Sequence, residues 1–219
     1  MITLNTIILL FAAYLIGSMP FAVWVGQAFY GIDVREYGSG NAGATNTMRV
    51  LGKRAGISVL FLDVMKGVLA VTLARIGTDY NLNSEQFVNL QLVLGISALF
   101  GHIFPVYAGF RGGKGIATLL GVVIALNPMA AVYSLLVFIG VLILTRYVSL
   151  SSMIASATFP LYIIFVEKTE YLSLITFSLF ITVLVIITHQ KNIERLIRRE
   201  ESKIFSKNQN IEDDDEVDD

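Results

Sequence analysis

The sequence has no cysteine, only two histidines and little charge, and each shortage excludes a class of chemistry. Without cysteine the chain has no disulfide, no thiolate nucleophile, no iron–sulfur cluster and no cysteine-based zinc site. Neither histidine has a cluster of carboxylates beside it, which argues against a catalytic metal site built by the protein. We therefore expect no metal and no cofactor, and nothing in the composition points to a nucleic acid as a partner.

Hydrophobic residues make up 55% of the 219 residues and charged residues only 15%. This composition is too apolar for a soluble domain of this length and predicts an all-α integral membrane protein. We expect a compact helix bundle over residues 1–207 that forms one membrane-embedded domain. The last segment, 208–219, is polar and then acidic, and is expected to be a disordered cytoplasmic tail.

The acidic residues at the end of the chain offset a net positive charge on the rest of it. Seven of the 17 acidic residues lie within 212–219, so residues 1–211 carry 16 basic residues against 10 acidic ones. A basic body suits a protein that handles phosphorylated substrates beside anionic lipids.

Apolar runs predict about seven transmembrane helices. The first run has no basic leader and is interpreted as a span rather than a cleaved signal, with a kink near Gly17, Ser18 and Pro20. The fourth run is short against the roughly 20 residues of a full crossing, so we expect it to be tilted or partly sunk below the surface. The expected spans are 7–29, 57–76, 87–106, 116–126, 128–144, 149–166 and 171–188.

Residues 116–144 could form one long helix or two helices broken at Asn127 and Pro128. Proline fits the first turn of a helix and asparagine before it is a good cap, which favours the break. The charges agree, because only the break places the basic segment 191–207 on the same side as Arg111. The N-terminus is then expected outside and the C-terminus in the cytoplasm.

The first of three polar segments covers residues 38–53, GSGNAGATNTMRVLGK. Its hydroxyls and amides can bond a polyol, and its arginine can bind phosphate with two parallel hydrogen bonds. The alternative is an ordered loop whose polar side chains cap turns. The candidate site residues in this segment are Ser39, Asn41, Thr45, Asn46 and Arg49.

The second polar segment, GHIFPVYAGFRGGKGIAT, covers residues 101–118 and places Arg111 and Lys114 among glycines, just before an apolar helical run. Glycine backbone amides, two cations and a helix N-terminus together predict a phosphate cradle. The alternative is a short basic loop that follows the positive-inside rule. A nucleotide P-loop is excluded, because Ala108 and Gly115 stand where that motif needs Gly and Ser or Thr.

The third polar segment begins at His189, which shares a helix face with Asn192 one turn later. We expect His189 to donate a hydrogen bond to a substrate phosphate or to accept a proton, and the amphipathic stretch after it, up to residue 205, to lie along the surface. His102 is expected to be structural. Asp63 and Lys66, three residues apart in the second span, predict a structural ion pair near the site, and the alternative is a direct contact with the substrate.

These segments resemble the motifs of the bacterial acyl-phosphate-dependent glycerol-3-phosphate acyltransferases. The resemblance implies transfer of a fatty acyl group from acyl phosphate to the 1-hydroxyl of glycerol 3-phosphate, the first acylation of phospholipid biosynthesis. It also implies a multi-pass protein of the bacterial cell membrane with its active site at the cytoplasmic face. The matching stretches are YLIGSMPFA (14–22), GSGNAGATNTMRVLG (38–52), LDVMKG (62–67), GHIFPVYAGFRGGKGIAT (101–118) and HQKNIERL (189–196).

The resemblance also implies roles for particular residues. The catalytic group would be Ser39, Arg49, Lys114, His189 and Asn192. The substrate and phosphate ligands would be Gly40, Asn41, Thr45, Asn46, Gly112, Gly113, Gly115 and Thr118. The family's third motif continues to a Gly before a Glu, whereas this chain has Arg199 there, and spacing assigns the family's Glu to Glu201.

The expected partners are acyl phosphate, glycerol 3-phosphate, the lipid bilayer and the enzyme that makes the acyl phosphate. The proton acceptor is either His189 or a phosphate oxygen of the donor. Three other classes compete with this interpretation, and one of them, a purely structural membrane protein, would not need two cation-bearing glycine loops. A carrier for a phosphorylated molecule is disfavoured, because the polar chemistry gathers at one membrane face rather than at the midplane. A His-x4-Asp acyltransferase is disfavoured, because the matching position after His189 falls on a basic surface helix.

Overall fold

The computed structural model describes residues 3–76, 80–82 and 84–204, and within these ranges every regular element is helical. The expectation of an all-α protein is confirmed, whereas the predicted disordered tail, 208–219, lies outside the described residues. Short helical turns are η1 (Val34–Glu36), η2 (Leu73–Arg75), η3 (Val106–Ala108) and the π-helical η4 (Tyr162–Glu167). The α-helices are α1 (Leu4–Gly17), α2 (Phe21–Tyr30), α3 (Ala44–Leu51), α4 (Lys53–Thr72), α5 (Glu85–Ile103), α6 (Ile116–Leu126), α7 (Pro128–Thr145), α8 (Val148–Leu161), α9 (Leu172–Thr188) and α10 (Gln190–Ile197).

Several helices are long and apolar enough to cross a membrane. Two bent pairs would each add one span, α1 with α2 at 41° and α9 with α10 at 59°. The predicted fourth span is α6, whose 11 residues fall short of the roughly 20 needed for a full crossing. Seven spans and the sidedness of the termini therefore stay predictions. The single spans among the described residues are Lys53–Arg75, Glu85–Ala108, Pro128–Thr145 and Val148–Glu167.

The first predicted span bends at Pro20, as expected. Helix α1 ends at Gly17 and α2 begins at Phe21. The amides of Val23 and Trp24 donate to the Pro20 carbonyl at 2.9 and 3.0 Å, so the second helix starts on the carbonyl of a residue that has no amide proton itself. The kink predicted from the small residues and the proline is confirmed.

The break between α6 and α7 is also confirmed. Asn127 caps α7 by accepting a hydrogen bond from the Ala130 amide at 2.9 Å, and Pro128 occupies the first helical position. The side-chain nitrogen of Asn127 donates to Glu167, which fastens this corner to the end of η4. The chain therefore reverses here instead of continuing as one helix.

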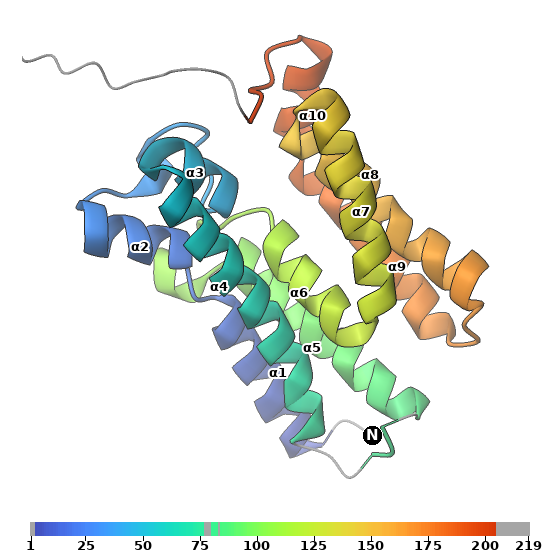
Figure 1. Cartoon of the computed structure of the whole chain (residues 1–219). Helices are drawn as coiled ribbons and strands as arrows, with labels where there is room; N and C mark the ends of the chain where they lie inside the picture. Colours follow the sequence, from blue (N-terminus) through green and yellow to red (C-terminus); the bar gives the residue numbers. More distant parts are fainter. Residues whose placement is uncertain (1–2, 77–79, 83, 205–219) are drawn as a thin grey trace, which may run out of the picture.

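The helices form two groups in Figure 1, α1 to α6 on one side and α7 to α10 on the other. Helix α6 joins the groups, because it packs on α4 and also contacts α7. A Cβ on Gly67 of α4 would clash with the Thr118 carbonyl of α6. Likewise, a Cβ on Gly121 of α6 would clash with the Val64 carbonyl of α4. These glycines allow the two backbones to approach closely, as small residues do between membrane helices.

The three polar segments meet at one end of the bundle. Helices α3 and α10 lie at this end in Figure 1, away from the N-terminus. The loop before α6 reaches the third segment, because Lys114 donates a hydrogen bond to Asn192. The chain after α10 returns to the corner between α7 and α8, where the Ile204 amide donates to the Arg146 carbonyl at 3.0 Å. Segments separated by more than 70 residues therefore surround one space.

Candidate active site

A cavity of about 440 Å³ lies among the three polar segments and continues between α6 and the helices α7, α8 and α9. Gly40, Gly112, Gly113 and Thr118 are the predicted site residues that do not line it. The other predicted residues do, and they are Ser39, Asn41, Thr45, Asn46, Arg49, Lys114, Gly115, His189 and Asn192. The structure thus brings together most of the predicted site, including all five residues expected to be catalytic.

Asn46 organises the turn that carries Ser39. Its amide nitrogen donates to the carbonyls of Val34 at 2.7 Å and Tyr37 at 3.1 Å. Its amide oxygen accepts from the Ser39 backbone at 2.8 Å and from the Ser39 hydroxyl at 3.0 Å. These four bonds use the full capacity of a buried amide. Asn46 was predicted to bind substrate, but the structure gives it a different task, which is to hold Ser39 in place.

Ser39 and Arg49 both line the cavity, but they differ in the hydrogen bonds that they can still form with a ligand. The Ser39 hydroxyl uses its only proton on Asn46, so its oxygen can still accept a hydrogen bond from a ligand. Arg49 lies in the last turn of α3, where the helix dipole favours a cation, and its side chain is exposed. Within the described part of the chain, the Arg49 guanidinium has no hydrogen bond or ion pair. Its five N–H donors are therefore available to an anion.

Lys114 lies on the loop before α6 and lines the cavity. Its ammonium donates to the side-chain oxygen of Asn192. Burial lowers the pKa of Lys114 to about 8, which the carboxylate of Glu201 opposes and the cations Arg195 and Arg49 reinforce. With a pKa of about 8, the Lys114 ammonium is mostly charged at neutral pH, and nearby negative charge does not fully compensate its desolvation. An arriving phosphate would supply that charge.

The loop glycines before Lys114 face α5 rather than the cavity. The amides of Gly112 and Gly113 donate to the carbonyls of Ile103 and His102, each at 3.2 Å. A Cβ on Gly112 would clash with the His102 carbonyl, and a Cβ on Gly113 would clash with the His102 ring and the Ala42 carbonyl. We predicted that these amides cradle a phosphate, but in the structure they are already bonded. The two glycines are needed here for close approach instead.

The free amides at this site come from the start of α6. Gly115, at a φ of +80°, leads into the helix and lines the cavity together with Ile116 and Ala117. The first bond inside α6 runs from the Leu119 amide to the Gly115 carbonyl at 2.7 Å, so the Ile116 and Ala117 amides have no helical partner. A helix N-terminus of this kind binds anions. The amides without a helical partner therefore lie a few residues after the loop glycines.

Behind the loop lies a buried ionic cluster. The Lys66 ammonium is 2.9 Å from the Asp63 carboxylate and donates to the Met19 carbonyl at 2.9 Å, which confirms the predicted ion pair. His102 Nδ1 lies 3.1 Å from the Thr118 hydroxyl and 3.7 Å from Asp63. Thr118, predicted to bind substrate, is fully buried against His102 and does not reach the cavity. This cluster supports the loop and the start of α6 from behind.

His189 stands where α9 turns into α10 and is almost completely buried. Its Nδ1 lies 2.8 Å from the Val185 carbonyl, and because a carbonyl can only accept, this nitrogen carries a proton. In the neutral ring Nε2 is then the unprotonated nitrogen, able to accept a proton or a hydrogen bond from a cavity ligand. His189 lines the same cavity as the other residues predicted to be catalytic.

The chain after α10 turns back and places Glu201 in the site. The amphipathic pattern predicted a helix to residue 205, but α10 ends at Ile197 and Arg199 adopts a φ of +60°. This left-handed conformation favours glycine, the residue expected at this position of the family motif. The turn lets Glu201 Oε1 accept from Asn192 at 2.7 Å and from Ser149 at 2.6 Å.

Ser149 was missed by the sequence analysis. It lies in the first turn of α8 and reaches the third segment only because Glu201 folds back over it. A serine-rich start to a predicted span, SLSS at 149–152, was the available signal. Ser149, Glu201, Asn192 and Lys114 form one continuous chain of hydrogen bonds across the polar end.

The rest of the cavity is an apolar groove. It is lined by Leu120 and Val123 of α6, Phe138 of α7, Phe159 of α8 and Ile181 of α9. Phe159 and Ile181 are buried, whereas Leu135, which α7 contributes to the groove, is exposed. A single cavity therefore joins a cationic end to a hydrocarbon-like end. Among the described residues no three His, Asp or Glu side chains come together as metal ligands would.

The chain is similar to known proteins in sequence and in fold. Residues 7–199 match the sequence model described as glycerol-3-phosphate acyltransferase. The glycerol-3-phosphate acyltransferase of Enterococcus faecalis is 42% identical over 208 residues, which span 92% of this chain and 93% of that one.

Two crystal structures of PlsY (YgiH), described as an integral membrane glycerol 3-phosphate acyltransferase, share the fold. The TM-score is 0.81 for the glycerol 3-phosphate form and 0.79 for the lysophosphatidic acid form. Each is 36% identical and covers 90% of this chain and 94% of that chain. Together with its apolar helices, this likeness makes the protein a multi-pass membrane protein. On both sequence and fold, the chain belongs to the glycerol-3-phosphate acyltransferase family.

Proposed function

We propose that the protein transfers a fatty acyl group from acyl phosphate to the 1-hydroxyl of sn-glycerol 3-phosphate, giving 1-acyl-glycerol 3-phosphate and inorganic phosphate. The observation that carries this proposal is the single cavity that joins Arg49 and Lys114 to an apolar groove. Two phosphorylated groups need two cations, and a fatty chain needs an apolar channel. The relatives' names and the glycerol 3-phosphate and lysophosphatidic acid forms of PlsY support the acceptor and the product.

The acyl phosphate donor is supported by what the site contains. An acyl phosphate is a mixed anhydride that is already activated, so the hydroxyl can attack its carbonyl carbon without a covalent enzyme intermediate. The sequence has no cysteine and no Gly-x-Ser-x-Gly elbow, and the Ser39 hydroxyl is engaged with Asn46. As the new ester bond forms, the bond from the carbonyl carbon to the phosphate oxygen breaks. Phosphate leaves as an anion that Arg49, Lys114 and the start of α6 can stabilise.

The same groups bring the reactants together. Two phosphorylated molecules repel each other, and the positive charges of Arg49 and Lys114 on one cavity offset that repulsion. The Ser39 hydroxyl donates its hydrogen bond to Asn46, so its oxygen can accept a hydrogen bond from a glycerol hydroxyl and orient it. The hydrogen-bond chain from Ser149 to Lys114 holds the ammonium in place before substrate arrives, so little reorganisation is needed during the reaction.

The proton of the attacking hydroxyl has two candidate acceptors, His189 Nε2 and a phosphate oxygen of the donor. The two predict different results for His189→Ala. If His189 is the base, kcat falls by about 10² to 10⁴-fold and the acid limb of the pH profile disappears. If the phosphate oxygen is the base, kcat falls much less and the pH profile keeps its shape. His189 then acts by hydrogen bonding.

The fatty chain would occupy the groove between α6 and α8. Each methylene removed from water contributes about 0.8 kcal/mol, so the groove supplies much of the donor's affinity. The groove wall contributed by α7 allows exchange of the chain with the bilayer. The charged end of the bundle would then face the cytoplasm of a bacterial cell, where glycerol 3-phosphate and the enzyme that makes acyl phosphate are found.

The test is phosphate release by the purified protein in detergent with palmitoyl phosphate and glycerol 3-phosphate, run beside acyl-CoA and acyl-carrier-protein donors. We expect release only with palmitoyl phosphate, dependent on glycerol 3-phosphate, with the 1-acyl product identified by mass spectrometry. Turnover with a thioester donor alone would reject the acyl phosphate mechanism. Uptake of glycerol 3-phosphate into vesicles without acyl transfer would instead support a carrier.

A further inference from the structure

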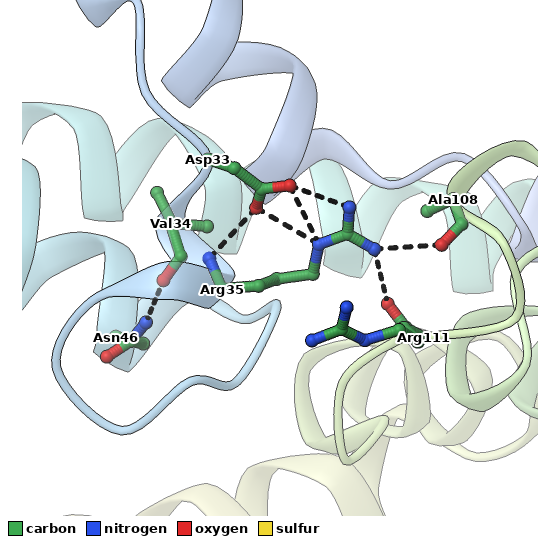
Figure 2. Close-up of polar contacts among 6 residues, drawn as sticks. All are labelled: Asp33, Val34, Arg35, Asn46, Ala108 and Arg111. Carbon is green, nitrogen blue, oxygen red and sulfur yellow. Dashed lines mark hydrogen bonds and ion pairs between the residues drawn. The ribbon is translucent and has the colours of Figure 1, made fainter.

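Asp33 and Arg35 form a tight ion pair beside the site, and neither lines the cavity. The Asp33 carboxylate accepts from Arg35 Nε at 3.0 and 3.1 Å, from Arg35 Nη2 at 2.6 Å and from the Arg35 backbone amide at 2.9 Å. Figure 2 shows the carboxylate facing the edge of the guanidinium. Both side chains are about five-sixths buried, with 16% and 15% exposed. The plane of the guanidinium is therefore fixed.

The opposite edge of the Arg35 guanidinium holds the loop that leads to Lys114. Its Nη1 donates to the carbonyls of Ala108 at 2.8 Å and Arg111 at 3.2 Å, as Figure 2 shows. The Arg111 carbonyl belongs to the peptide bond just before Gly112. One side chain thus fastens the entry of the loop at two points, 73 and 76 residues away in the sequence.

The segment that carries Arg35 also carries the Ser39 turn. The carbonyl of its neighbour Val34 accepts from Asn46, which in turn holds the backbone and hydroxyl of Ser39. A stretch of seven residues, 33–39, is therefore bonded on one side to the Lys114 loop and on the other to α3. The cavity has two cationic walls, α3 with Arg49 and the loop with Lys114. This stretch is bonded to both and so links their positions.

We propose that Arg35 is a positioning residue that sets the spacing between the Ser39–Arg49 segment and the Lys114 loop, and that it thereby determines affinity for glycerol 3-phosphate. This inference rests on the proposed function, since it names a determinant of acceptor binding at the same site. Glycerol 3-phosphate is small and polar and depends on polar contacts alone. The donor also gains from its buried chain. A misplaced loop should therefore weaken the acceptor more than the donor.

The experiment compares Arg35→Lys with wild type and with Arg75→Lys, an exposed arginine in η2 at the far end of α4. Lysine keeps the positive charge but cannot pair with Asp33 and hold two carbonyls at once. For Arg35→Lys we expect KM for glycerol 3-phosphate to rise about tenfold, KM for palmitoyl phosphate to rise less than about threefold, and kcat to change little. Arg75→Lys should match wild type in all three.

The outcomes separate this inference from the proposed function. A wild-type protein without activity would reject the proposed function. An active wild type with Arg35→Lys at unchanged KM would reject the positioning role, and so would a variant that loses thermal stability and kcat with KM unchanged. If Arg35→Lys does not fold, Asp33→Asn provides the measurement, because it keeps Arg35 but weakens its clamp. A selective rise in KM for glycerol 3-phosphate in Asp33→Asn supports the role, and its absence overturns it.

Discussion

The two cationic walls of the cavity are built in contrasting ways. Arg49, on α3, is exposed, and among the described residues its guanidinium has no partner. Lys114, on the loop before α6, is half-buried and already bonded to Asn192, which in turn donates to Glu201. Arg49 can adapt to an incoming anion, whereas Lys114 is held in position before the anion arrives. Two positive charges at one cavity can therefore have different roles, since Arg49 can capture the anion and Lys114 is preorganised to bind it.

Removing either cation should produce the largest effects. We expect Lys114→Ala and Arg49→Ala each to lower kcat/KM by about 10² to 10³-fold, the usual loss for a donor that stabilises developing charge. The conservative variants should differ. Lys114→Arg should be nearly as damaging as Lys114→Ala, because a planar guanidinium spreads its charge over a fork and cannot reproduce the compact ammonium that Asn192 holds in place. Arg49→Lys should retain about tenfold more activity than Arg49→Ala, because an exposed side chain can readjust.

Steady-state kinetics with thermal melting of each purified variant would check these values. Similar activity in the two conservative variants would remove the contrast between the walls. Normal turnover in Lys114→Ala or Arg49→Ala would overturn the site assignment.

Gly113→Ala should test whether the loop works through close packing rather than through free amides. The new methyl group would meet the His102 ring and the Ala42 carbonyl, so the loop must shift and Lys114 with it. We expect kcat/KM to fall by about 10 to 100-fold, chiefly through KM for glycerol 3-phosphate. The matched control is Gly140→Ala in α7, where a Cβ would meet no atom within 4 Å. The control should keep full activity and gain roughly 0.5–1 kcal/mol of stability.

If Gly113→Ala kept wild-type kinetics, the loop would not depend on this contact. A loss of equal size in the Gly140 control would show that the assay responds to any change in a helix or loop.

The pH dependence of kcat/KM should distinguish the contribution of Lys114 from that of Arg49. The pKa of Lys114 is lowered to about 8, so its charge is present below that pH and is lost as the pH rises through it. A guanidinium, unlike an ammonium, is not deprotonated in proteins. We therefore expect kcat/KM for glycerol 3-phosphate to fall about tenfold per pH unit above pH 8, and Arg49→Lys to keep this limb. A flat profile between pH 7 and 9.5 would show that the charge on Lys114 is not required.

Ser149→Ala should have the smallest effect, because it acts on Lys114 through two intermediates. Loss of its hydrogen bond to Glu201 loosens Asn192 and leaves Lys114 less well oriented. We expect kcat to fall about threefold, in keeping with one net hydrogen bond of about 1 kcal/mol that is only partly transmitted. The control is Ser151→Ala, whose hydroxyl donates within α8 to the Tyr147 carbonyl at 2.8 Å and should leave kcat unchanged. Equal kcat values for the two variants would contradict the relay.

Local features of the fold could be predicted because their causes lie within a few residues. The kink at Pro20 and the break at Asn127 follow from a missing amide proton and a capping side chain. The ion pair of Asp63 and Lys66 follows from a spacing of three residues on one helix. The number of spans could not be predicted in this way. Helix α6 is too short for its apolar pattern alone to decide whether it crosses the bilayer.

The site was predicted in outline, and its errors have one physical origin. The sequence indicates which residues can bind an anion, but not which of their donors are already in use. Asn46, Gly112 and Gly113 were predicted as ligands, yet their polar groups are bonded to partners that the sequence pattern does not show. Ser149 was missed for the same reason, since its partner Glu201 lies 52 residues away.

By itself, the sequence determined the class of protein, the three polar segments and the chemistry of their side chains, because composition and local spacing decide hydropathy, caps and charge. Only the tertiary structure decided how Arg49 and Lys114 differ and which amides remain free. It also showed how Arg35 and Glu201 tie the walls together. These properties depend on hydrogen bonds and burial between residues far apart in the chain, which become fixed only when the helices pack.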